Sequence, residues 1–333
     1  RAAIAKKTGI SRPTISESAQ RLEKSDLVVE TSRKTRNKQG RAGVIYEINA
    51  AKGLTLAIAI DVKQIQLRLT DLSLKVIRDQ CFYIDPGWQQ AELAEAILRF
   101  IRLAVQDQSS PLLAIGVSVA VPVNSQTGEI LALPYSKFTV IHGINFKTLL
   151  EEHFACPVAL DNDVNWATLA EKSLGIAKNV SDFVFIYFGE GIGAGIYLDN
   201  HLIRGSTGIS GEIGHIMVNN NENLQDFVSN HHLQQALEDG VDLTGHPAIS
   251  QIGNTLASIA AVINPKMFVL GGPMTKYPQF IPAIIKQIQP QLFNEVSFIP
   301  SNAPNYAPLN GVQAGTYELA LSSFGLPSPP EAE

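Results

Sequence analysis

The sequence predicts an α/β protein made of two similar lobes and preceded by a small basic module. From residue 54 onward, short β-rich runs alternate with helical patterns, which is typical of α/β architecture. A related series of strands and a long helix begins again at residue 183. The charge is also divided, because residues 1–53 hold 12 Lys and Arg against 5 Asp and Glu (+7), whereas the remainder is −12. We therefore expect only the first segment to meet a polyanion.

The length allows more than one domain. A chain of 333 residues that is 45% hydrophobic can bury a large core. We expect a winged helix-turn-helix over 1–52, a first lobe over 53–165, a second lobe over 166–325 and a tail over 326–333, with the last helix returning to the first lobe. Because Arg1 stands where an initiator Met is usual, we also expect that a few preceding residues are missing.

The first segment has the spacing of a helix-turn-helix. A short helical stretch ends at Gly9, which can adopt the positive φ of a tight turn, and Ser11 is placed to cap a second helix. Ile4, Ile10 and Ile15 are expected to form the apolar seam between the helices. The residues of this helix that we expect at DNA are Ser11, Arg12, Thr14, Ser16 and Glu17.

A basic hairpin follows these helices. The apolar runs 27–30 and 44–48 are typical of two strands joined by a polar loop. Such a hairpin resembles the wing of a winged helix, which touches phosphates while the recognition helix enters the major groove. Its expected DNA contacts are Lys34, Arg36, Lys38 and Arg41. The alternative is a solvated basic loop beside a small protein-docking module.

In the larger part of the chain, strands and helices can be placed by their apolar patterns. Three consecutive strands are expected first, followed by an amphipathic helix and two buried parallel strands. The second series repeats two strands, a helix and a strand. The expected strands are 54–61, 66–70, 76–82, 114–121, 158–160, 183–188, 193–198 and 267–270, and the expected helices are 91–105 and 252–263. An internal duplication of this kind places a ligand between its halves.

Four segments carry the polar and glycine-rich residues expected at this cleft. In 160–167, an apolar strand ends in carboxylates and amides that open a helix, and such polar groups face the ligand crevice of α/β folds. The segment 189–195 is a glycine-dense turn between strands. In 205–215, one carboxylate and one imidazole lie in a glycine-rich loop, and 269–273 is a strand followed by a tight turn.

In this order and spacing, the four segments resemble the ROK family, named for repressors, open reading frames and sugar kinases. The resemblance covers about residues 1–325 and rests mainly on 162–165 and 211–215. The N-terminal segment is similar to the xylose- and N-acetylglucosamine-type repressor branch. The resemblance implies an actin-like, hexokinase-type (ribonuclease H-like) pair of lobes. It also implies that sugar hydroxyls are held by Asn162, Asp163, Glu212 and His215.

The sequence departs from the kinases of this family at both phosphate loops. Residues 61–66 match a loop in which two glycines and a hydroxyl hold ATP, and all three are absent here. Glu190 stands where a Thr is usual, and a carboxylate repels phosphate. We therefore expect no phosphoryl transfer, no nucleotide cofactor and no catalytic residue. Asp163, which matches the general base of the kinases, is expected to serve as a sugar ligand.

A third departure concerns the zinc loop of the family. The stretch 217–224 has no cysteine, so no metal is expected there. Gln225 stands where the family has a glutamate that accepts sugar hydroxyls, and we expect it to contact the sugar with altered selectivity.

Cysteine content and hydropathy indicate a soluble, cytoplasmic protein. Cys81 and Cys156 are too few for a disulfide framework, and both are expected to be buried. No apolar run approaches the ~18 residues that span a bilayer, so no membrane is expected as a partner.

Three hypotheses remain at this stage. The first is a sugar-responsive regulator, most simply a repressor of carbohydrate-utilisation genes, that binds operator DNA as a homodimer or dimer of dimers and responds to a sugar or sugar phosphate. The second is an ATP-dependent sugar kinase with an appended DNA-binding domain. The third is a regulator controlled by a protein partner, with a vestigial sugar site.

Overall fold

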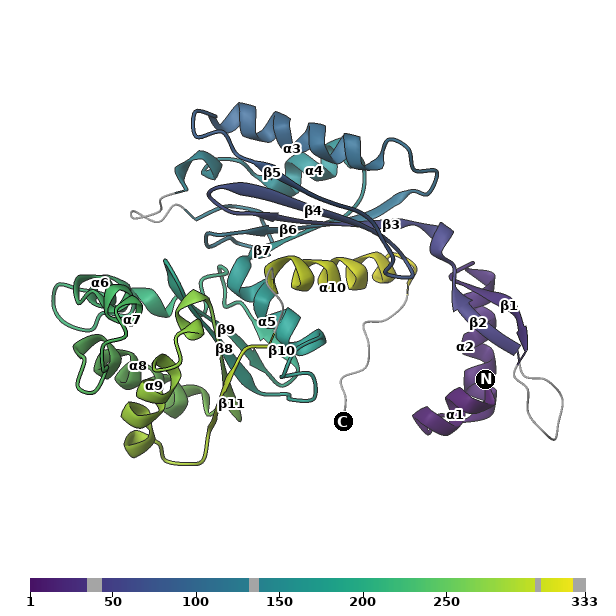
Figure 1. The fold of residues 1–333 in the computed structure, drawn as a ribbon. Helices are drawn as coiled ribbons and strands as arrows, with labels where there is room; N and C mark the ends of the chain where they lie inside the picture. The colour runs from purple at the N-terminus through teal and green to yellow at the C-terminus, as the bar shows by residue number, and fades with distance from the viewer. Residues whose placement is uncertain (35–43, 132–137, 303–306, 326–333) are drawn as a thin grey trace.

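The computed structural model describes residues 1–34, 44–131, 138–302 and 307–325. Two lobes lie one above the other in Figure 1, and a small N-terminal module lies at the lower right, joined to the upper lobe at β3. Each lobe contains one five-stranded mixed sheet, and the module contains a two-stranded one. The expected α/β architecture is therefore confirmed for both lobes.

The sheet of the first lobe has the order β5-β4-β3-β6-β7. In it β3 is antiparallel to β4 and parallel to β6. Helices α3 (Gln90–Val105) and α4 (Phe146–Phe154) cover one face, as Figure 1 shows. The strands are β3 (Leu54–Ile60), β4 (Gln64–Asp71), β5 (Val76–Tyr83), β6 (Leu112–Val119) and β7 (Val158–Asn162).

The sheet of the second lobe repeats this arrangement. Its order is β10-β9-β8-β11-β12, which is again the third, second, first, fourth and fifth strand of the lobe. The strands are β8 (Phe183–Phe188), β9 (Ile192–Leu198), β10 (His201–Ile203), β11 (Met267–Gly271) and β12 (Ser297–Pro300). The helices of this lobe are α6 (Leu224–Asn230), α7 (Leu233–Glu238), α8 (Pro247–Ile263) and α9 (Phe280–Ile288). The duplication expected from the sequence is present in the topology.

Two corresponding helices cross between the sheets. Helix α5 (Asp163–Ser173) follows the first sheet but packs on β8 and β9 of the second, whereas α10 (Ala307–Ser322) follows the second sheet and packs on β3 and β6 of the first. Their crossing is close, because a Cβ at Gly311 would lie 1.7 Å from the Trp166 carbonyl oxygen. Trp166 in turn donates from Nε1 to the carbonyl of Val117 at 2.9 Å. The expected division at 165/166 falls inside α5.

The N-terminal module contains two helices and a hairpin. Helix α1 (Ala2–Thr8) ends at Gly9, whose φ is 74°, and Ser11 caps α2 (Arg12–Lys24) by accepting from the Thr14 amide. Strands β1 (Val28–Lys34) and β2 (Val44–Ile48) are antiparallel. Short 3₁₀ helices occur here and in the lobes, at Ala50–Lys52, Thr139–Ile141, Ile213–His215, Pro273–Lys276 and Gln289–Gln291.

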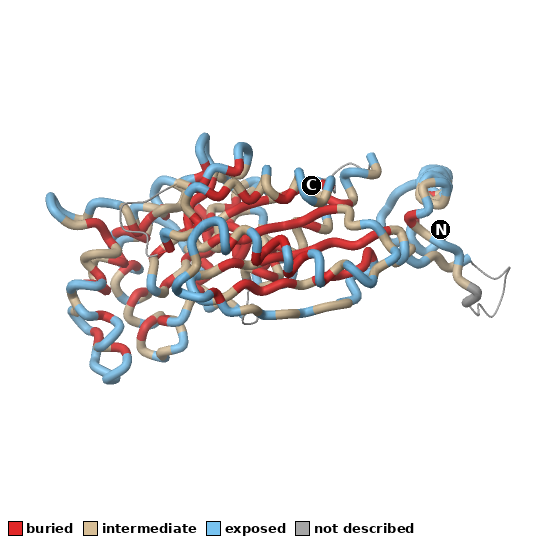
Figure 2. Tube along the Cα trace, turned by 90° about the horizontal axis from the view of Figure 1, so that it is seen from above, coloured by how far each residue is buried: buried red, intermediate tan, exposed pale blue. Residues whose placement is uncertain are grey.

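Three expectations about apolar residues were wrong. Ile4 and Ile10 are 48% and 46% exposed, since no described element covers this side of α1, and Figure 2 shows that the N-terminal module is largely exposed. Among the side chains of the two helices that the structure describes, Ala5 and Ile15 are buried. Cys81 is exposed because β5 is an edge strand, whereas Cys156 is buried.

Within the described ranges, no helix has both the length and the apolar content needed to cross a bilayer.

Candidate sugar site between the lobes

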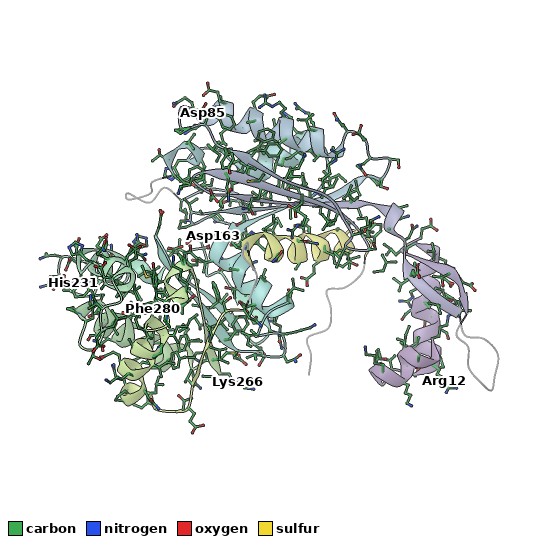
Figure 3. All side chains as sticks on the ribbon, in the orientation of Figure 1. Arg12, Asp85, Asp163, His231, Lys266 and Phe280 are labelled. Carbon is green, nitrogen blue, oxygen red and sulfur yellow. The ribbon has the colours of Figure 1, made fainter. Side chains whose placement is uncertain are left out.

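The polar cluster at 161–165 lies where β7 ends and α5 begins. The Oδ1 atom of Asn162 accepts from the amides of Val164 and Asn165 at 2.8 and 3.3 Å, and thereby caps the helix. Asp163 is the first residue of α5, and Figure 3 places it between the two lobes. The carboxyl group of Asp163 is thus held at the N-terminus of α5, the helix that follows the first sheet and packs on the second.

Asp161 is a structural member of this cluster that the sequence interpretation did not single out. It is 1% exposed and accepts from Arg204 Nε at 2.6 Å and from Asn165 Nδ2 at 2.7 Å. The Arg204 contact ties the glycine-rich loop of the second lobe to the last strand of the first. A buried carboxylate needs a partner of this kind, but nothing in the sequence indicated which arginine would supply it.

Asp163 and Glu212 carry strongly perturbed carboxyl groups. Burial raises the pKa of Asp163 to about 6, and the nearby charge of Asp61 adds to the effect. Burial likewise raises the pKa of Glu212 to about 7, with a further contribution from Asp163. Neither takes part in an ion pair within the described residues. Two neighbouring carboxyl groups without a cation are well suited to hydrogen bonds from ligand hydroxyls.

The other three expected sugar ligands have different surroundings. The Oδ1 of Asn162 is occupied by the helix cap, which leaves its amide nitrogen to donate. His215 is partly buried at the end of the 3₁₀ turn that begins after Glu212. The Oε1 of Gln225 accepts from the amide of Ile192 at 3.2 Å, so this side chain braces the turn between β8 and β9.

In the turn that matches the first phosphate loop, the side chain of Asp61 accepts hydrogen bonds from the backbone of the same turn. Asp61 Oδ1 accepts from the amides of Lys63 and Gln64 at 2.7 and 2.9 Å. These are the positions where the resembling kinases have glycine. Ile65, which replaces the hydroxyl residue, is buried. In the second turn, Glu190 is exposed. Two backbone donors suited to a phosphate are therefore already engaged.

Amide and carboxylate side chains hold the stretch that matches the zinc loop. Asn219 Oδ1 accepts from the amides of Asn221 and Glu222 at 2.8 and 2.9 Å. Glu222 accepts in turn from the side chains of Asn219 and Asn230 at 2.9 and 2.7 Å. The part of the chain that the structure describes contains no group of three His, Cys, Asp or Glu able to hold a metal.

The residues expected at DNA lie on the N-terminal module or outside the described residues. Arg12, Thr14 and Glu17 are exposed on α2. Figure 3 shows Arg12 far from Asp163. Ser11 is the helix cap, and Ser16 is partly buried. Glu17 forms an ion pair with Arg21. Lys34 ends β1, and Arg36, Lys38 and Arg41 lie outside the described residues.

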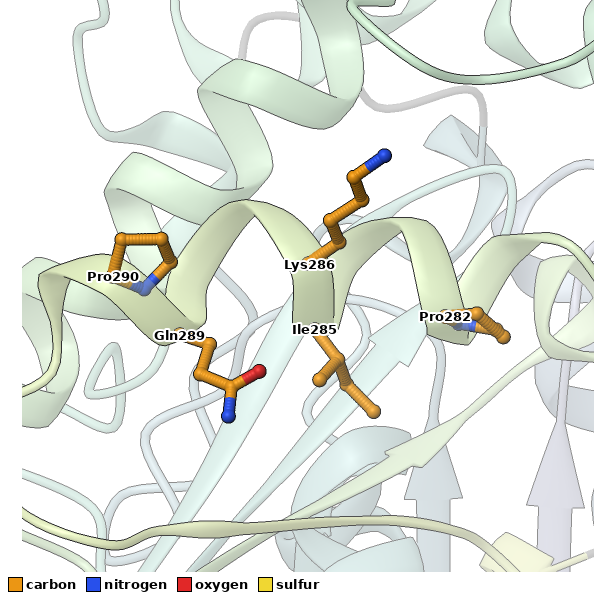
Figure 4. A pocket seen from close by; sticks show the side chains of 5 residues that line it. All are labelled: Pro282, Ile285, Lys286, Gln289 and Pro290. Atoms are coloured by element: carbon orange, nitrogen blue, oxygen red, sulfur yellow. The ribbon is translucent and has the colours of Figure 1, made fainter.

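A separate surface hollow of about 510 Å³ lies on α9 (Figure 4). It is lined by Pro282, Ile285, Lys286, Gln289 and Pro290. Helix α9 packs on the face of the second sheet opposite to α5, because its buried residues join the cluster of Ile186 and Phe188. This hollow is thus remote from the polar cluster and has a single charged group.

The comparison with known families decides the assignment of the lobes. The model of the ROK family matches residues 55–227, which include both phosphate-loop positions and the polar cluster. The chain belongs to the ROK family. It is 27% identical over 358 residues to the xylose repressor of Bacillus spizizenii, an alignment that covers 96% of this chain and 91% of that protein.

Two solved structures show how far the ROK fold extends along the chain. A ROK family transcriptional regulator, described as a homologue of the E. coli MLC protein, is 20% identical with a TM-score of 0.74 and covers 96% of this chain and 93% of that one. A ROK hexokinase from Thermus thermophilus is 21% identical with a TM-score of 0.67, and covers 81% of this chain and 99% of that one. The sugar-kinase-like fold of the lobes is therefore confirmed.

Proposed function

We propose that this ROK protein is a sugar-responsive transcription regulator, a repressor of carbohydrate-utilisation genes whose effector is a free sugar of the xylose type. The observation that carries the proposal is the pair Asp163 and Glu212, two cleft carboxyl groups with raised pKa values and no ion-pair partner among the described residues. The name of the B. spizizenii relative supports both the sugar and the regulatory role.

The sugar is proposed to bind across the junction of β7 and α5. Asp163 and Glu212 accept from its hydroxyls, and the amide nitrogen of Asn162 donates to one of them. His215 and Gln225 complete the set. For Gln225 the free group is Nε2, because its oxygen already accepts from Ile192. Vicinal hydroxyls need this mixture of donors and acceptors.

The N-terminal module is proposed to be a winged helix-turn-helix. Helix α2 would enter the major groove with Ser11, Arg12, Thr14, Ser16 and Glu17. The hairpin residues Lys34, Arg36, Lys38 and Arg41 would contact phosphates. The exposed face of α2 and the net charge of +7 in residues 1–53 support this role. As a homodimer the protein would bind half-sites about one helical turn apart.

Helix α10 contacts both α5, which carries the proposed sugar ligand Asp163, and the apolar cluster that includes the N-terminal module. At its middle, Gly311 and Gly315 lie against Trp166 of α5, three residues after Asp163. At its far end, Ala320 joins an apolar cluster with Leu27 of the module. Further members are Leu22, Leu72, Leu113, Ala114, Tyr317, Leu319 and Phe324. A sugar that favours one position of α5 would therefore bias the position of the module.

Phosphoryl transfer is not part of the proposed function. Asp163 could act as a general base, but the amides of the first phosphate turn are engaged by Asp61. A sugar kinase with an appended module remains the second candidate, because the lobes share the fold of the Thermus hexokinase. It predicts sugar-dependent ADP release that disappears on Asp163→Asn.

The test is thermal unfolding of the intact chain with a panel of free and phosphorylated sugars, each with and without Mg-ATP. Saturation at ~100 times Kd should add about 2.7 kcal/mol to the free energy of unfolding. The proposal expects stabilisation by D-xylose that is indifferent to ATP, with no ADP released. ADP release would favour the kinase. No shift with any sugar would refute the sugar site and direct attention to a protein partner.

A further inference from the structure

The loop at 204–215 follows β10 and is held on the second lobe by its backbone. The Ala194 amide of β9 donates to the carbonyl of Gly211 at 2.7 Å. Within the loop, the Ser210 amide donates to the carbonyl of Arg204 at 3.2 Å, so the chain between them closes on itself. A displacement of the second lobe would therefore carry this whole loop with it.

The same loop also contacts the first lobe through its backbone. Gly208 has a φ of 85°, and a Cβ at this residue would lie 2.1 Å from the carbonyl oxygen of Val123. Val123 is fully buried in the core of the first lobe. The loop thus approaches the first lobe so closely that it leaves no room for a side chain at Gly208.

An ion pair is the second contact between this loop and the first lobe. Arg204 Nε donates to Asp161 Oδ2 at 2.6 Å. Asp161 is 1% exposed, and its Oδ1 atom accepts from the amide of Asn162 and the side chain of Asn165 at 2.8 and 2.7 Å. Because a buried charge without its partner is unfavourable, the pair favours the arrangement of the lobes in which the loop lies against β7.

The ion pair lies between the two groups of proposed sugar ligands. Its acidic partner directly precedes Asn162 and Asp163, and its basic partner begins the loop that carries Glu212 and His215. The contact therefore governs how far apart these two groups lie. Because 36% of the Arg204 side chain is exposed, water competes for the guanidinium. The pair thus biases the arrangement of the lobes without locking it, and a sugar can still shift it.

We infer that Arg204 is a positioning residue for the proposed sugar site: its ion pair with Asp161 brings the ligands of the two lobes within reach of one sugar before the sugar binds. Without the pair, the arrangement able to bind sugar is present in a smaller fraction of the molecules, and the apparent Kd rises in inverse proportion to that fraction. This inference rests on the proposed function and adds the contact that prepares its site.

The first test is calorimetric titration of the intact chain with D-xylose. Asp161→Asn keeps the shape of the side chain and its Oδ1 acceptor but turns a donor toward Arg204, and Arg204→Met removes the charge. Each should raise the Kd for D-xylose by about 10-fold or more. The double variant leaves neither charge unpaired and should lose no more affinity than either single one, because the same contact is lost.

Arg78→Met is the matched control. Arg78 forms an ion pair of 2.9 Å with Asp107 within the first lobe, and this pair does not connect the lobes. The Kd for D-xylose should stay within about twofold of native in this variant.

The second test measures the separation of the lobes directly. Spin labels are attached at Glu95→Cys on α3 and Ser258→Cys on α8, both exposed positions, in a Cys81→Ser background. Cys156 is buried and stays unlabelled. Electron–electron double resonance should give one narrow distance distribution for the otherwise native chain without sugar. Adding Arg204→Met should broaden it, and saturating D-xylose should narrow it again.

Unchanged D-xylose affinity in Arg204→Met and Asp161→Asn, or a distance distribution that Arg204→Met does not broaden, would overturn the inference while leaving a sugar site in place. Failure of the native chain to bind any sugar would instead refute the proposed function. In that case the distance distributions without sugar still decide whether the ion pair holds the lobes together.

Discussion

Helices α5 and α10 occupy equivalent positions in the two lobes but differ in the chemistry of their ends. Helix α5 starts with Asp163, directly after a strand that ends in Asp161 and Asn162. Helix α10 has no acidic residue in its first turn, and its distinctive end is the other one, where Tyr317 and Ala320 meet the N-terminal module. Helix α5 is thus polar at its N-terminus, whereas α10 is apolar at its C-terminus, where it packs in one cluster with the N-terminal module.

The difference shows how a duplicated fold can separate two tasks. The polar start of α5 contains carboxyl groups that cost stability when they are charged, as binding sites commonly do. The apolar finish of α10 needs only complementary packing. Since the helices cross at Gly311, a displacement caused at one end can be transmitted to the other.

The largest effect is expected at the crossing itself. Gly311→Val places side-chain atoms where the Trp166 carbonyl already lies, and a Cβ alone would be 1.7 Å from that oxygen. We expect the free energy of unfolding to fall by about 3 kcal/mol, as measured by urea denaturation. Replacing glycine in a helix by a residue with a side chain usually stabilises it. A stability gain would therefore contradict the close crossing.

Ser322→Ala is the control for that substitution, because Ser322 is exposed near the end of the same helix. It should change the free energy of unfolding by less than about 0.5 kcal/mol.

At the polar end, Asp163→Asn and Glu212→Gln should weaken D-xylose binding by about 10- to 100-fold at about pH 8, where both carboxyl groups are charged, since each replaces a charged acceptor with a neutral amide oxygen that forms a weaker hydrogen bond. Operator affinity in the absence of sugar should not change, because neither residue contacts the module. Calorimetry measures the first quantity and fluorescence anisotropy the second. Glu95→Gln, an exposed carboxyl on α3, serves as control. An equal loss of D-xylose affinity in all three variants would show that the loss does not depend on contact between these carboxyl groups and the sugar.

The same carboxyl groups predict a dependence of stability on pH. The folded pKa values of Asp163 and Glu212, about 6 and about 7, lie above the ordinary values of 3.8 and 4.5. Their contribution is therefore complete below about pH 4 and is lost as the pH rises through 6 and 7. Between pH 5 and 8 the free energy of unfolding should fall by on the order of 2 kcal/mol. Asp163→Asn should show a clearly smaller fall, and a fall as large as the native one would contradict the assignment.

At the apolar end, Leu22→Ala should have the smallest effect on stability, about 1 kcal/mol, because the side chain is only partly buried. Leu22→Ala should have a larger effect on the coupling between sugar binding and operator binding. Sugar affinity should stay within about twofold of native, while the change in operator affinity on adding xylose should shrink several-fold. Val29→Ala, at an exposed position of β1, should leave both quantities unchanged. If xylose changed operator affinity as much in Leu22→Ala as in the native protein, α10 would not be the connection between the sugar site and the module.

The sequence predicted those features that depend on local pattern. Eight of the ten strands of the lobes, the Ser11 cap and the junction at Asn162 each follow from a few adjacent residues, whereas the short edge strands β10 and β12 were not predicted. The partnership of Asp161 with Arg204 depends on residues brought together by the fold, so no local pattern indicated it. The exposure of Ile4 was missed for a related reason, since periodicity shows an apolar face without showing what covers it.

The central claim is that a sugar in the cleft controls DNA binding by the module, and operator affinity with and without sugar tests it most directly. A duplex selected by the intact protein from a random pool would be titrated by fluorescence anisotropy, with and without saturating D-xylose. A repressor of sugar utilisation must leave its operator when the sugar is present, so the account predicts an affinity about 5- to 150-fold weaker with xylose. Selection of no duplex, or equal affinity with and without xylose, would contradict it.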